Sequence, residues 1–363
     1  MTRLERLLTT AKRRGVDAVA LVPGTNLRYV TGIYYHPGER LSMAVFDTNG
    51  RCGFVMPAMD AARTARECAI PFTLYPWDDS QPPQESMSRM IGDLGLRGRV
   101  VAVEHEAMRV FELMSLQLAG VGDTPDAAPI LTELRIVKDA AELAIMQQAA
   151  RMIDDSLDRL LPGIKPGMTE RQVASVWLTE ILDLGAEGPA FEFIIASGPN
   201  ASSPHHGTGE RVLQNGDMVI LDGGARHRGY NSDITRTVSL GEPSAENRRI
   251  YDIVLAANTA GREAARPGMT GRQLDAAARK VIEDAGFGEN FMHRTGHGLG
   301  MDIHEPPYVA ATYNEPFPVG CVFTIEPGVY LPGRTGVRIE DDVVMTDKGG
   351  VSLTKYRREL IVL

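Results

Sequence analysis

One stretch of apolar and polar residues near the middle of the chain predicts a β-hairpin. The apolar run Met218–Leu221 ends at Asp222, and a glycine-rich turn follows it. From Asp233 onward polar and apolar residues alternate, which is the two-residue period of a strand with one buried face. We expect Asp222 to pair with Asp233, with residues 223–232 as the connection. Two facing carboxylates repel each other, so such a pair at the end of an apolar strand predicts a bound cation.

The first 130 residues alternate between helical and strand-like patterns, which predicts an α/β domain. The expected helices are Leu4–Arg14, Ala58–Cys68, Pro83–Asp93 and Ala107–Leu118. The expected strands are Asp17–Val22, Leu41–Asp47, Cys52–Met56, Phe72–Tyr75 and Arg99–Val103. No glycine-rich phosphate loop follows any of these strands, and Pro23–Asn26 is expected to be a plain turn. The proline- and aspartate-containing segment Gly122–Pro129 is the expected linker.

The second part of the chain contains an internal repeat. A helix is expected at Ala140–Leu160, and the segment Lys165–Val173 that follows resembles Arg266–Leu274. Both copies carry a Thr-x-x-Gln capping box at the start of a helix. Two acidic residues recur at matched places: Asp222 with Glu326, and Asp233 with Glu340. A unit of about a hundred residues is too long for a solenoid repeat. We therefore expect a duplicated α+β half-domain, with two halves facing each other across a pseudo-twofold axis and one curved sheet backed by four helices.

The four acidic residues of the repeat are expected to meet at the centre of that sheet and to hold two divalent metal ions. Six of the eight histidines lie between residues 205 and 304, and His297 has a glycine on either side, which lets the backbone approach a metal closely. Mostly oxygen ligands with one imidazole favour manganese, with cobalt, iron and zinc as alternatives. Two adjacent metals suit hydrolysis, because they acidify a water and polarise a carbonyl group.

Taken singly, these residues have plainer explanations. An aspartate before Gly-Gly at the end of a strand is usually part of a turn, and Glu340–Asp342 alone is typical of a solvated acidic turn. His36, His105 and His227 are expected to be surface or structural residues, and His293 either supports the site or ends a helix. The recurrence of the acidic residues in two halves favours a metal site.

The composition indicates a two-domain protein of the reducing cytosol. The chain has 363 residues, of which 43% are hydrophobic and 23% charged, as in ordinary soluble proteins. No run approaches the roughly 20 apolar residues of a membrane span, and the N-terminus lacks the apolar core of a secretory signal. Three scattered cysteines argue against a disulfide framework. A net charge of −9 without a basic stripe argues against nucleic acid. We expect a cytoplasmic protein without membrane or nucleic-acid partners.

These segments resemble the pita-bread metallopeptidases of family M24, which include methionine aminopeptidase, prolidase and aminopeptidase P. The resemblance rests on six segments: Pro204–His205, Asp222–Ala225, Gly229–Thr237, His293–Glu305, Thr324–Tyr330 and Val337–Asp341. Residues 1–130 resemble the creatinase-type N-terminal domain of the proline-specific branch, and residues 131–363 resemble its catalytic domain. The join at Glu133–Asp139 is also typical of that branch.

The resemblance implies a role for particular residues. The five metal ligands would be Asp222, Asp233, His297, Glu326 and Glu340. Of these, Asp233 and Glu340 would bridge the two metals, and Glu326 would also carry a proton from the attacking water to the leaving nitrogen. His205 and His304 would contact the substrate, and Arg338 would help to hold the site. His206 is only an additional neighbour. A homodimer is also implied.

The resemblance further implies cleavage of the bond between an N-terminal residue and a following proline. Many short prolidases place an arginine soon after the His-Glu pair, where it holds the carboxylate of a dipeptide. Here His304–Val309 has Tyr308 in that region. Loss of a bidentate clamp favours longer Xaa-Pro-Xaa peptides, so we expect an Xaa-Pro aminopeptidase, with an Xaa-Pro dipeptidase as the alternative. Another arginine, from this chain or a partner, could replace the clamp. The remote alternatives are a creatinase-like amidinohydrolase and a non-enzymatic binding protein, but both differ from this chain in lacking the full ligand set.

Overall fold

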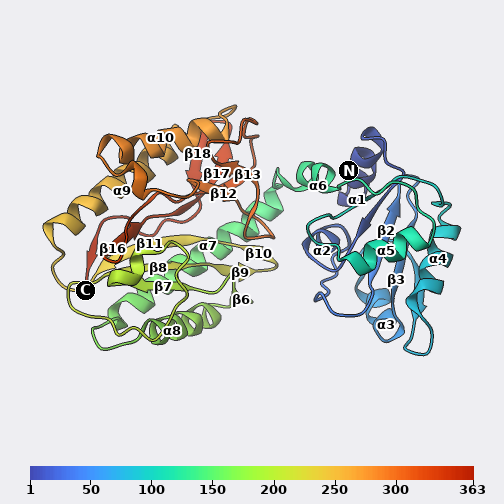
Figure 1. The fold of residues 1–363 in the computed structure, drawn as a ribbon, viewed down its shortest axis with the longest axis horizontal. Coiled ribbons are helices and arrows are strands. Elements are labelled where there is room, and N and C mark those ends of the chain that lie inside the picture. Colours follow the sequence, from blue (N-terminus) through green and yellow to red (C-terminus); the bar gives the residue numbers. More distant parts are fainter. The chain divides into compact units, whose positions relative to one another are not determined.

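The computed structural model describes residues 1–363 and divides them into two units, Met1–Arg135 and Ile136–Leu363 (Figure 1). From the sequence we expected the boundary between the two domains at residue 130. The first unit is an α/β domain and the second is an α+β domain with an internal repeat, as predicted. No helix in either unit is both long enough and apolar enough to cross a membrane.

The first unit is built on one five-stranded sheet of order β4-β3-β2-β1-β5. Its strands are β1 Ala18–Leu21, β2 Met43–Asp47, β3 Cys52–Pro57, β4 Thr73–Trp77 and β5 Val101–Val103. Its helices are α1 Arg3–Arg13, α2 Thr25–Thr31, α3 Ala58–Glu67, α4 Pro83–Asp93, α5 Val110–Leu118 and α6 Ala128–Arg135. Apolar residues of α4 and α5 pack against one face of the sheet. Strand β1 pairs with β5 in parallel and with β2 in antiparallel orientation, so the sheet is mixed.

Two predictions for this unit were wrong. Residues Pro23–Asn26 are not a plain turn, because helix α2 begins at Thr25 directly after Gly24. Segment Gly122–Pro129 is not a free linker either. Its backbone bonds to β5, with Val103 donating to the carbonyl of Pro125 at 2.9 Å and Ala127 donating to the carbonyl of Val103 at 2.8 Å. The turn-forming composition of this segment was therefore overridden by an open edge of the sheet.

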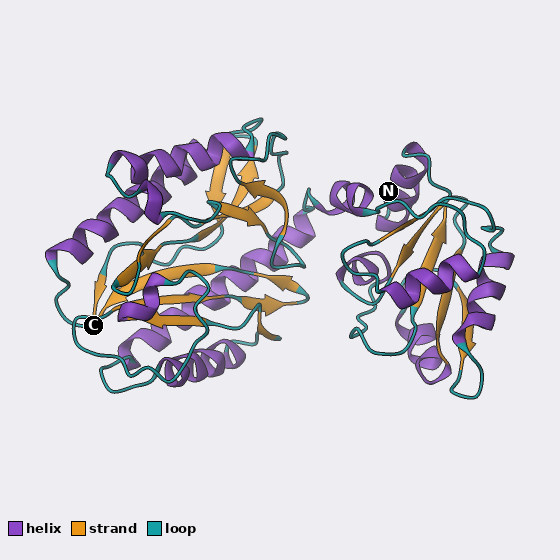
Figure 2. Ribbon diagram, viewed as in Figure 1, coloured by secondary structure: helices purple, strands orange, loops and turns teal.

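The second unit encloses its strands between two pairs of helices, as Figure 2 shows. The helices are α7 Ala140–Leu160, α8 Glu170–Asp183, α9 Ala245–Ala264 and α10 Gly271–Asp284, with short 3₁₀ turns η1 Leu161–Gly163, η2 Gly198–Ser202 and η3 Gly288–Asn290. The strands of the first half are β6 Gly188–Pro189, β7 Ile194–Ser197, β8 Met218–Gly223, β9 Ala225–His227, β10 Tyr230–Asn231 and β11 Ile234–Ser239. Those of the second half are β12 Gly296–Gly298, β13 Glu305–Val309, β14 Val322–Ile325, β15 Gly328–Leu331, β16 Thr335–Arg338, β17 Asp341–Thr346, β18 Gly349–Ser352 and β19 Ile361–Val362.

The internal repeat is visible in the local structure of both halves. The predicted capping boxes are formed at Thr169 and Gln172 of α8 and at Thr270 and Gln273 of α10. Each capping threonine also makes an isolated antiparallel bridge just outside its helix, to Val212 and to Pro316 respectively. Equivalent sequences thus adopt equivalent caps and equivalent neighbours, which is the pseudo-twofold pita-bread arrangement.

The strands of this unit do not form the single curved sheet that was expected. Hydrogen bonding divides them into four sheets, of orders β10-β9-β6, β19-β11-β8-β7, β13-β12-β14-β17-β18 and β15-β16. The ladders are interrupted where the acidic residues lie. Strands β14 and β15 are separated at Glu326–Pro327, and β16 and β17 at Ile339–Glu340. Pro327 has no N–H to donate to a ladder, which accounts for the first of these breaks.

The register of the first hairpin also differs from the prediction. Asp222 is opposite Thr235, and Asp233 lies two residues further along the same face. The strands continue through β9 and β10 to a two-residue turn at Arg228 and Gly229, whose φ angles of 49° and 81° are those of a hairpin turn with two left-handed positions. The turn fixes the register, so residues 223–232 are mostly paired strand. A shift by two residues keeps both carboxylates on one face.

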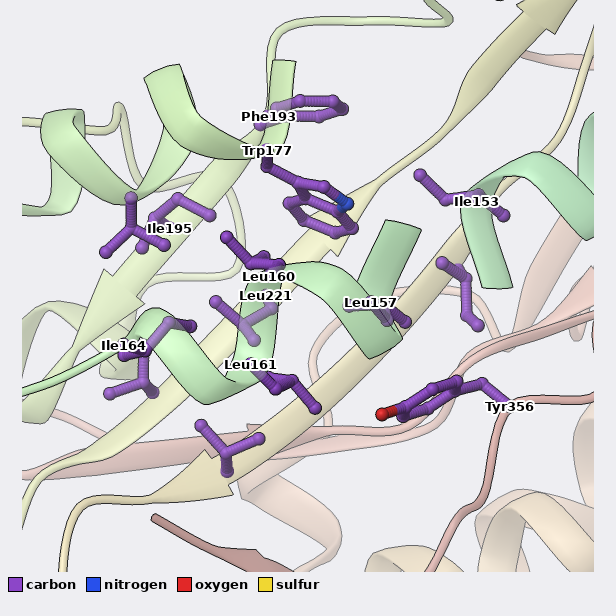
Figure 3. Packing of buried hydrophobic residues seen from close by; sticks show 14 of the residues in the cluster. Ile153, Leu157, Leu160, Leu161, Ile164, Trp177, Phe193, Ile195, Leu221 and Tyr356 are labelled. Carbon is purple, nitrogen blue, oxygen red and sulfur yellow. The ribbon is translucent and has the colours of Figure 1, made fainter. Parts of the chain in front are cut away.

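The core of the first half supports this hairpin from behind (Figure 3). Trp177 of α8 stacks on Phe193 with ring centroids 4.5 Å apart, and its indole N–H donates to the Ser156 hydroxyl at 2.7 Å. Ile234 and Val238 of β11 belong to this core, whereas Thr235 and Thr237 face the other way, toward Glu340 and Arg338. The alternating pattern therefore separates a buried apolar face from a polar face.

Candidate metal centre

All eight site residues predicted from the sequence line one cavity of about 350 Å³. They are Asp222, Asp233, His297, Glu326, Glu340, His205, His304 and Arg338. The first five, the predicted metal ligands, come from both halves of the repeat and lie far apart along the chain. The remaining wall is formed by Phe191, Ile194, Pro204, His293, Arg294 and Ile303. The fold thus brings the whole predicted set together.

The two glycines after Asp222 are required by close packing. A β-carbon on Gly223 would lie 2.6 Å from the Phe193 ring and 2.8 Å from Trp177. One on Gly224 would lie 1.9 Å from the carbonyl oxygen of Ser232. The Gly-Gly pair therefore lets the end of β8 sit tightly between the core and β10, and this fixes where the Asp222 carboxylate emerges.

Asp233 and Glu340 stand beside each other at the junction of the two halves. The Glu340 N–H donates to the carbonyl of Thr235 at 3.0 Å, and the Thr235 hydroxyl donates to Glu340 Oε2 at 2.7 Å. The Asp233 N–H donates to Asp342 Oδ2 at 3.0 Å. One buried carboxylate oxygen of each of three residues has no hydrogen-bond partner: Asp233 Oδ1, Glu340 Oε1 and Asp222 Oδ1. Buried polar atoms without a partner are costly, so these three oxygens point to a missing ligand.

His297 presents one ring nitrogen to the same acidic group. Its Nδ1 lies 3.1 Å from the carbonyl of Gly298, which directs Nε2 toward Asp233 at 3.7 Å and Glu326 at 3.5 Å. Burial and the neighbouring His304 lower the pKa of His297 to about 3, so its imidazole is neutral at pH 7. A neutral imidazole with its other nitrogen bonded to a carbonyl is a ready metal ligand.

The glycines on either side of His297 have a different reason from the one predicted. A β-carbon on Gly296 would lie 1.9 Å from the carbonyl of Thr324, and one on Gly298 would lie 2.3 Å from the carbonyl of Glu305. The glycines thus let β12 lie close to β14 and β13, rather than letting the backbone approach a metal. The packing of these strands fixes the direction of the histidine.

The acidic residues are strongly perturbed by burial and by one another. Burial, followed by the charge of Glu340, raises the pKa of Asp233 well above its ordinary value. Burial and Glu326 do the same for Glu340. Burial also raises the pKa of Glu326 to about 7, and the opposing charge of Arg338 offsets only part of it. Carboxyl groups in this state hold protons unless a cation neutralises them.

Arg338 is the one buried guanidinium in the cavity wall. It binds Asp222 Oδ2 at 2.5 Å, the Tyr330 hydroxyl at 2.8 Å and the Thr235 hydroxyl at 3.2 Å. A single positive charge cannot balance four carboxylates, so a further cation is needed. Ligand atoms of Asp233, His297 and Glu340 all lie within 4.8 Å of one another. The donor set of one imidazole and carboxylate oxygens fits divalent metal ions.

The histidines of the cavity differ in their surroundings. His304 is exposed, and its ring packs edge-on to that of His297 with centroids 4.2 Å apart. His205 is also exposed and follows Pro204 at the cavity wall. His293 supports the site, because its Nε2 lies 2.9 Å from the Tyr330 hydroxyl that also binds Arg338. Outside the cavity, His36 and His105 are exposed, and His227 contacts Gln148.

Sequence reasoning missed several residues of the site. Arg294 lines the cavity and Tyr330 binds Arg338 behind it; both lie inside segments already recognised, but no pattern marked them. His206 had been given little weight, yet it contacts Glu170 through Nε2 at 2.9 Å. Glu170 itself was overlooked. It is completely buried in the first turn of α8 and accepts hydrogen bonds from the Ser197 N–H and hydroxyl at 2.8 and 2.7 Å.

Glu170 ties together the segment that carries His205. Besides Ser197 and His206, it accepts hydrogen bonds from the Asn200 side chain at 3.0 Å and from the Gly209 N–H at 3.3 Å. Burial alone would raise the pKa of Glu170, but the hydrogen bonds from Ser197 and His206 outweigh it and lower the pKa. Because both ends of segment 197–209 are held by one carboxylate, Glu170 is a positioning residue for the loop between them.

Replacing Glu170 with glutamine should destabilise the chain by about 1–3 kcal/mol and lower kcat/KM, because an amide NH₂ would face donors it cannot satisfy. The lowered pKa means that the ionised form stabilises the fold above pH 4.5, and that this contribution is lost as the pH falls through the folded-state pKa. Urea unfolding between pH 3 and 7 should therefore show a weaker acid dependence in Glu170→Gln. The control is Glu210→Gln, whose exposed ion pair with Arg171 should contribute little. Equal effects of the two variants would contradict the prediction.

Comparison with protein families gives two matches that together cover most of the chain. Residues 144–347 match the model of metallopeptidase family M24, and residues 3–137 match the creatinase/prolidase N-terminal domain. A probable dipeptidase, PepE of Mycobacterium tuberculosis, is 37% identical over 96% of this chain and 92% of its own length. An Xaa-Pro dipeptidase of Pyrococcus furiosus is 33% identical over 99% of both chains.

Solved structures resemble both units together. A dipeptidase from Pyrococcus horikoshii has a TM-score of 0.95 and 40% identity, covering 100% of both chains. An X-Pro aminopeptidase from Thermotoga maritima has a TM-score of 0.89 and 30% identity, also covering 100% of both chains. The likeness therefore extends to a dipeptidase and to an X-Pro aminopeptidase, with a higher TM-score and identity for the dipeptidase.

Proposed function

Because the chain belongs to metallopeptidase family M24 and carries the creatinase/prolidase N-terminal domain, we propose that it is a metal-dependent Xaa-Pro dipeptidase. The Xaa-Pro aminopeptidase expected from Tyr308 has weaker support, since the relatives with higher identity are named dipeptidases. The observation that carries the proposal is the group of three unpartnered carboxylate oxygens beside a neutral histidine. Such a group is suited to metal-assisted hydrolysis.

Two divalent ions, for which we propose manganese, would be held by Asp222, Asp233, His297, Glu326 and Glu340. When bound, such ions acidify a water molecule and polarise the scissile carbonyl. The oxygen-rich donor set supports manganese, and cobalt, iron and zinc are the alternatives for reconstitution. Asp233 and Glu340 stand next to each other at the junction of the two halves, so both can contribute ligand atoms to one centre.

Glu326 is the proposed proton carrier of the reaction. It would accept a proton from the attacking water and deliver it to the proline nitrogen as the peptide bond breaks. The leaving nitrogen of an Xaa-Pro bond carries no hydrogen of its own, so its departure as an amine needs a donated proton.

His205 and His304 are proposed to hold the substrate at the open side of the cavity. Both are exposed at its wall and can donate hydrogen bonds to the scissile carbonyl or to the charge that develops on it. Phe191, Ile194 and Ile303 supply apolar surface in the same cavity, which suits a proline ring or an apolar first side chain. A volume of about 350 Å³ is enough for a dipeptide and lies near the lower end of ordinary ligand sites.

A substrate panel tests the proposal directly. Protein reconstituted with manganese is assayed on Ala-Pro, Ala-Pro-Ala and Ala-Ala, with release of the first alanine measured at each substrate concentration. We expect kcat/KM to be at least about tenfold higher for Ala-Pro than for Ala-Pro-Ala, a difference of about 1.4 kcal/mol in transition-state binding. Ala-Ala should be a poor substrate, because it lacks the proline ring.

The other outcomes select among the alternatives. A higher kcat/KM for Ala-Pro-Ala would instead indicate an Xaa-Pro aminopeptidase. Cleavage of neither proline peptide, with manganese bound, would favour a non-enzymatic binding protein. Hydrolysis of creatine instead would favour the amidinohydrolase.

A further inference from the structure

We propose that Arg294 binds the terminal carboxylate of a dipeptide substrate and that Tyr308 holds its guanidinium in place. This inference rests on the proposed function and names the side chain that would restrict the enzyme to dipeptide substrates. Tyr308 stands where many short prolidases have an arginine, and in this proposal it supports a different arginine that serves as the carboxylate clamp.

Arg294 lies at the cavity wall next to the groups that surround the scissile bond. It precedes β12, which carries His297, and it lines the same cavity as His205, His304 and Glu326. The guanidinium and the His304 ring thus face the same cavity, on the side of the metal ligand His297. A carboxylate one residue beyond the scissile bond would therefore enter the field of Arg294.

Tyr308 supports the guanidinium from one face. Arg294 Cζ lies 4.7 Å from the centroid of the Tyr308 ring, which is the geometry of a cation–π contact. Strand β13 carries Tyr308 and pairs with β12, so the two residues are neighbours because of the sheet. Such a contact restrains the guanidinium and leaves its N–H groups available for a bidentate partner.

The donors of Arg294 are not used elsewhere in the chain. None of the side-chain hydrogen bonds or ion pairs of the protein involves its guanidinium, although the side chain is half-buried. Arg338, the other arginine in the cavity wall, is already bound to Asp222, Tyr330 and Thr235. Arg294 is thus the cavity arginine with free donors for an incoming anion.

A carboxylate at this distance from the scissile bond distinguishes a dipeptide from a longer peptide. In Xaa-Pro the proline ends in a carboxylate, whereas in Xaa-Pro-Xaa the same carbonyl belongs to a neutral amide. A guanidinium fork pairs with both oxygens of a carboxylate, but an amide offers it only one. Arg294 would therefore favour the dipeptide, because only the dipeptide carries a carboxylate at this position.

The test compares Ala-Pro with Ala-Pro-amide, which differ only in that carboxylate. Replacing Arg294 with methionine should lower the ratio of kcat/KM for Ala-Pro to that for Ala-Pro-amide by about 10- to 100-fold, as expected for loss of a charged hydrogen-bonding partner. Arg294→Lys should retain part of the ratio, because it keeps the charge and loses the fork. Tyr308→Leu should lower the ratio less than Arg294→Met does. Arg334→Met removes an exposed arginine that pairs with Glu246 outside the cavity and should keep the wild-type ratio.

Product inhibition gives a second measure that does not depend on cleavage of the amide. Proline should inhibit the wild type more strongly than prolinamide, and Arg294→Met should remove this difference. An unchanged ratio in Arg294→Met, or equal inhibition by proline and prolinamide in the wild type, overturns the inference while leaving the dipeptidase proposal standing. Failure of the wild type to cleave Ala-Pro overturns both, so the two failures are distinguishable.

Discussion

Asp233→Asn should lower kcat/KM for Ala-Pro by at least about 10³-fold, which corresponds to about 4 kcal/mol of transition-state stabilisation. Asp233 is proposed to hold the metal ions together with His297 and Glu340, so its replacement removes a charged ligand from the middle of the site. Asparagine has nearly the same shape and can keep the backbone bond to Asp342, which accepts from the N–H of residue 233. The loss would therefore follow from the missing charge and not from a collapsed site. Steady-state kinetics with manganese in excess measures it.

The same variant should respond differently to metal in a stability measurement. In the wild type, free manganese at 100 times its Kd should add about 2.7 kcal/mol to the free energy of unfolding. In Asp233→Asn this gain should be much smaller. Without metal, the variant should unfold at a higher temperature than the wild type, because burial and the charge of Glu340 penalise the ionised aspartate, as its raised pKa indicates.

Asp252→Asn is the matched control, since Asp252 is exposed on α9. It should keep both the wild-type kinetics and the wild-type gain from manganese. Elemental analysis after dialysis completes the comparison. Unchanged metal content and turnover in Asp233→Asn would remove the basis for a metal centre at these residues.

The positions of the acidic residues could be predicted because they recur. Asp222 and Glu326 end equivalent strands, and Asp233 and Glu340 begin or precede equivalent ones. Each residue alone resembles a turn or surface acid, but duplication makes them a set. The capping boxes at Thr169 and Thr270 were also predictable, because they depend on four consecutive residues. Local patterns and repeats are therefore the parts of this fold that a single sequence reveals.

The register of the first hairpin could not be predicted in the same way. It depends on a two-residue turn in which Arg228 adopts a positive φ of 49°, a conformation that no residue pattern demanded. The segment Gly122–Pro129 was misread for a related reason. Its prolines and aspartates suggest a linker, but the open edge of β5 offered backbone partners. Both outcomes depend on pairing between strands rather than on the composition of either strand.

Contacts between distant segments account for the residues that were missed. Glu170 begins α8, yet its partners lie 27 to 39 positions further along the chain. Arg294 and Tyr308 become neighbours only when β12 pairs with β13. The sequence showed Tyr308 where a clamp was expected and left open that another arginine replaces it. The structure supplies the candidate, because it places Arg294 over the tyrosine ring.

Arg338→Met should lower the free energy of unfolding by about 3–5 kcal/mol in the absence of metal, the usual cost of removing one partner of a buried ion pair. Only 3% of the Arg338 side chain is exposed, and it binds Asp222, Tyr330 and Thr235. Methionine fills a similar volume but leaves Asp222 uncompensated among the other acidic residues. Urea unfolding of metal-free protein measures the loss, and the double variant Asp222→Asn with Arg338→Met should recover part of it.

Manganese should reduce the loss in Arg338→Met, because bound cations neutralise the carboxylates that the arginine no longer balances. Arg236→Met is the matched control. Arg236 is equally buried and pairs with Asp341 at 2.8 Å, but it does not line the cavity. Its removal should also destabilise the chain, and manganese should not restore that loss beyond the gain seen in the wild type. If manganese rescues both variants equally, or if Arg338→Met is as stable as the wild type, Arg338 does not balance the charge of a metal centre.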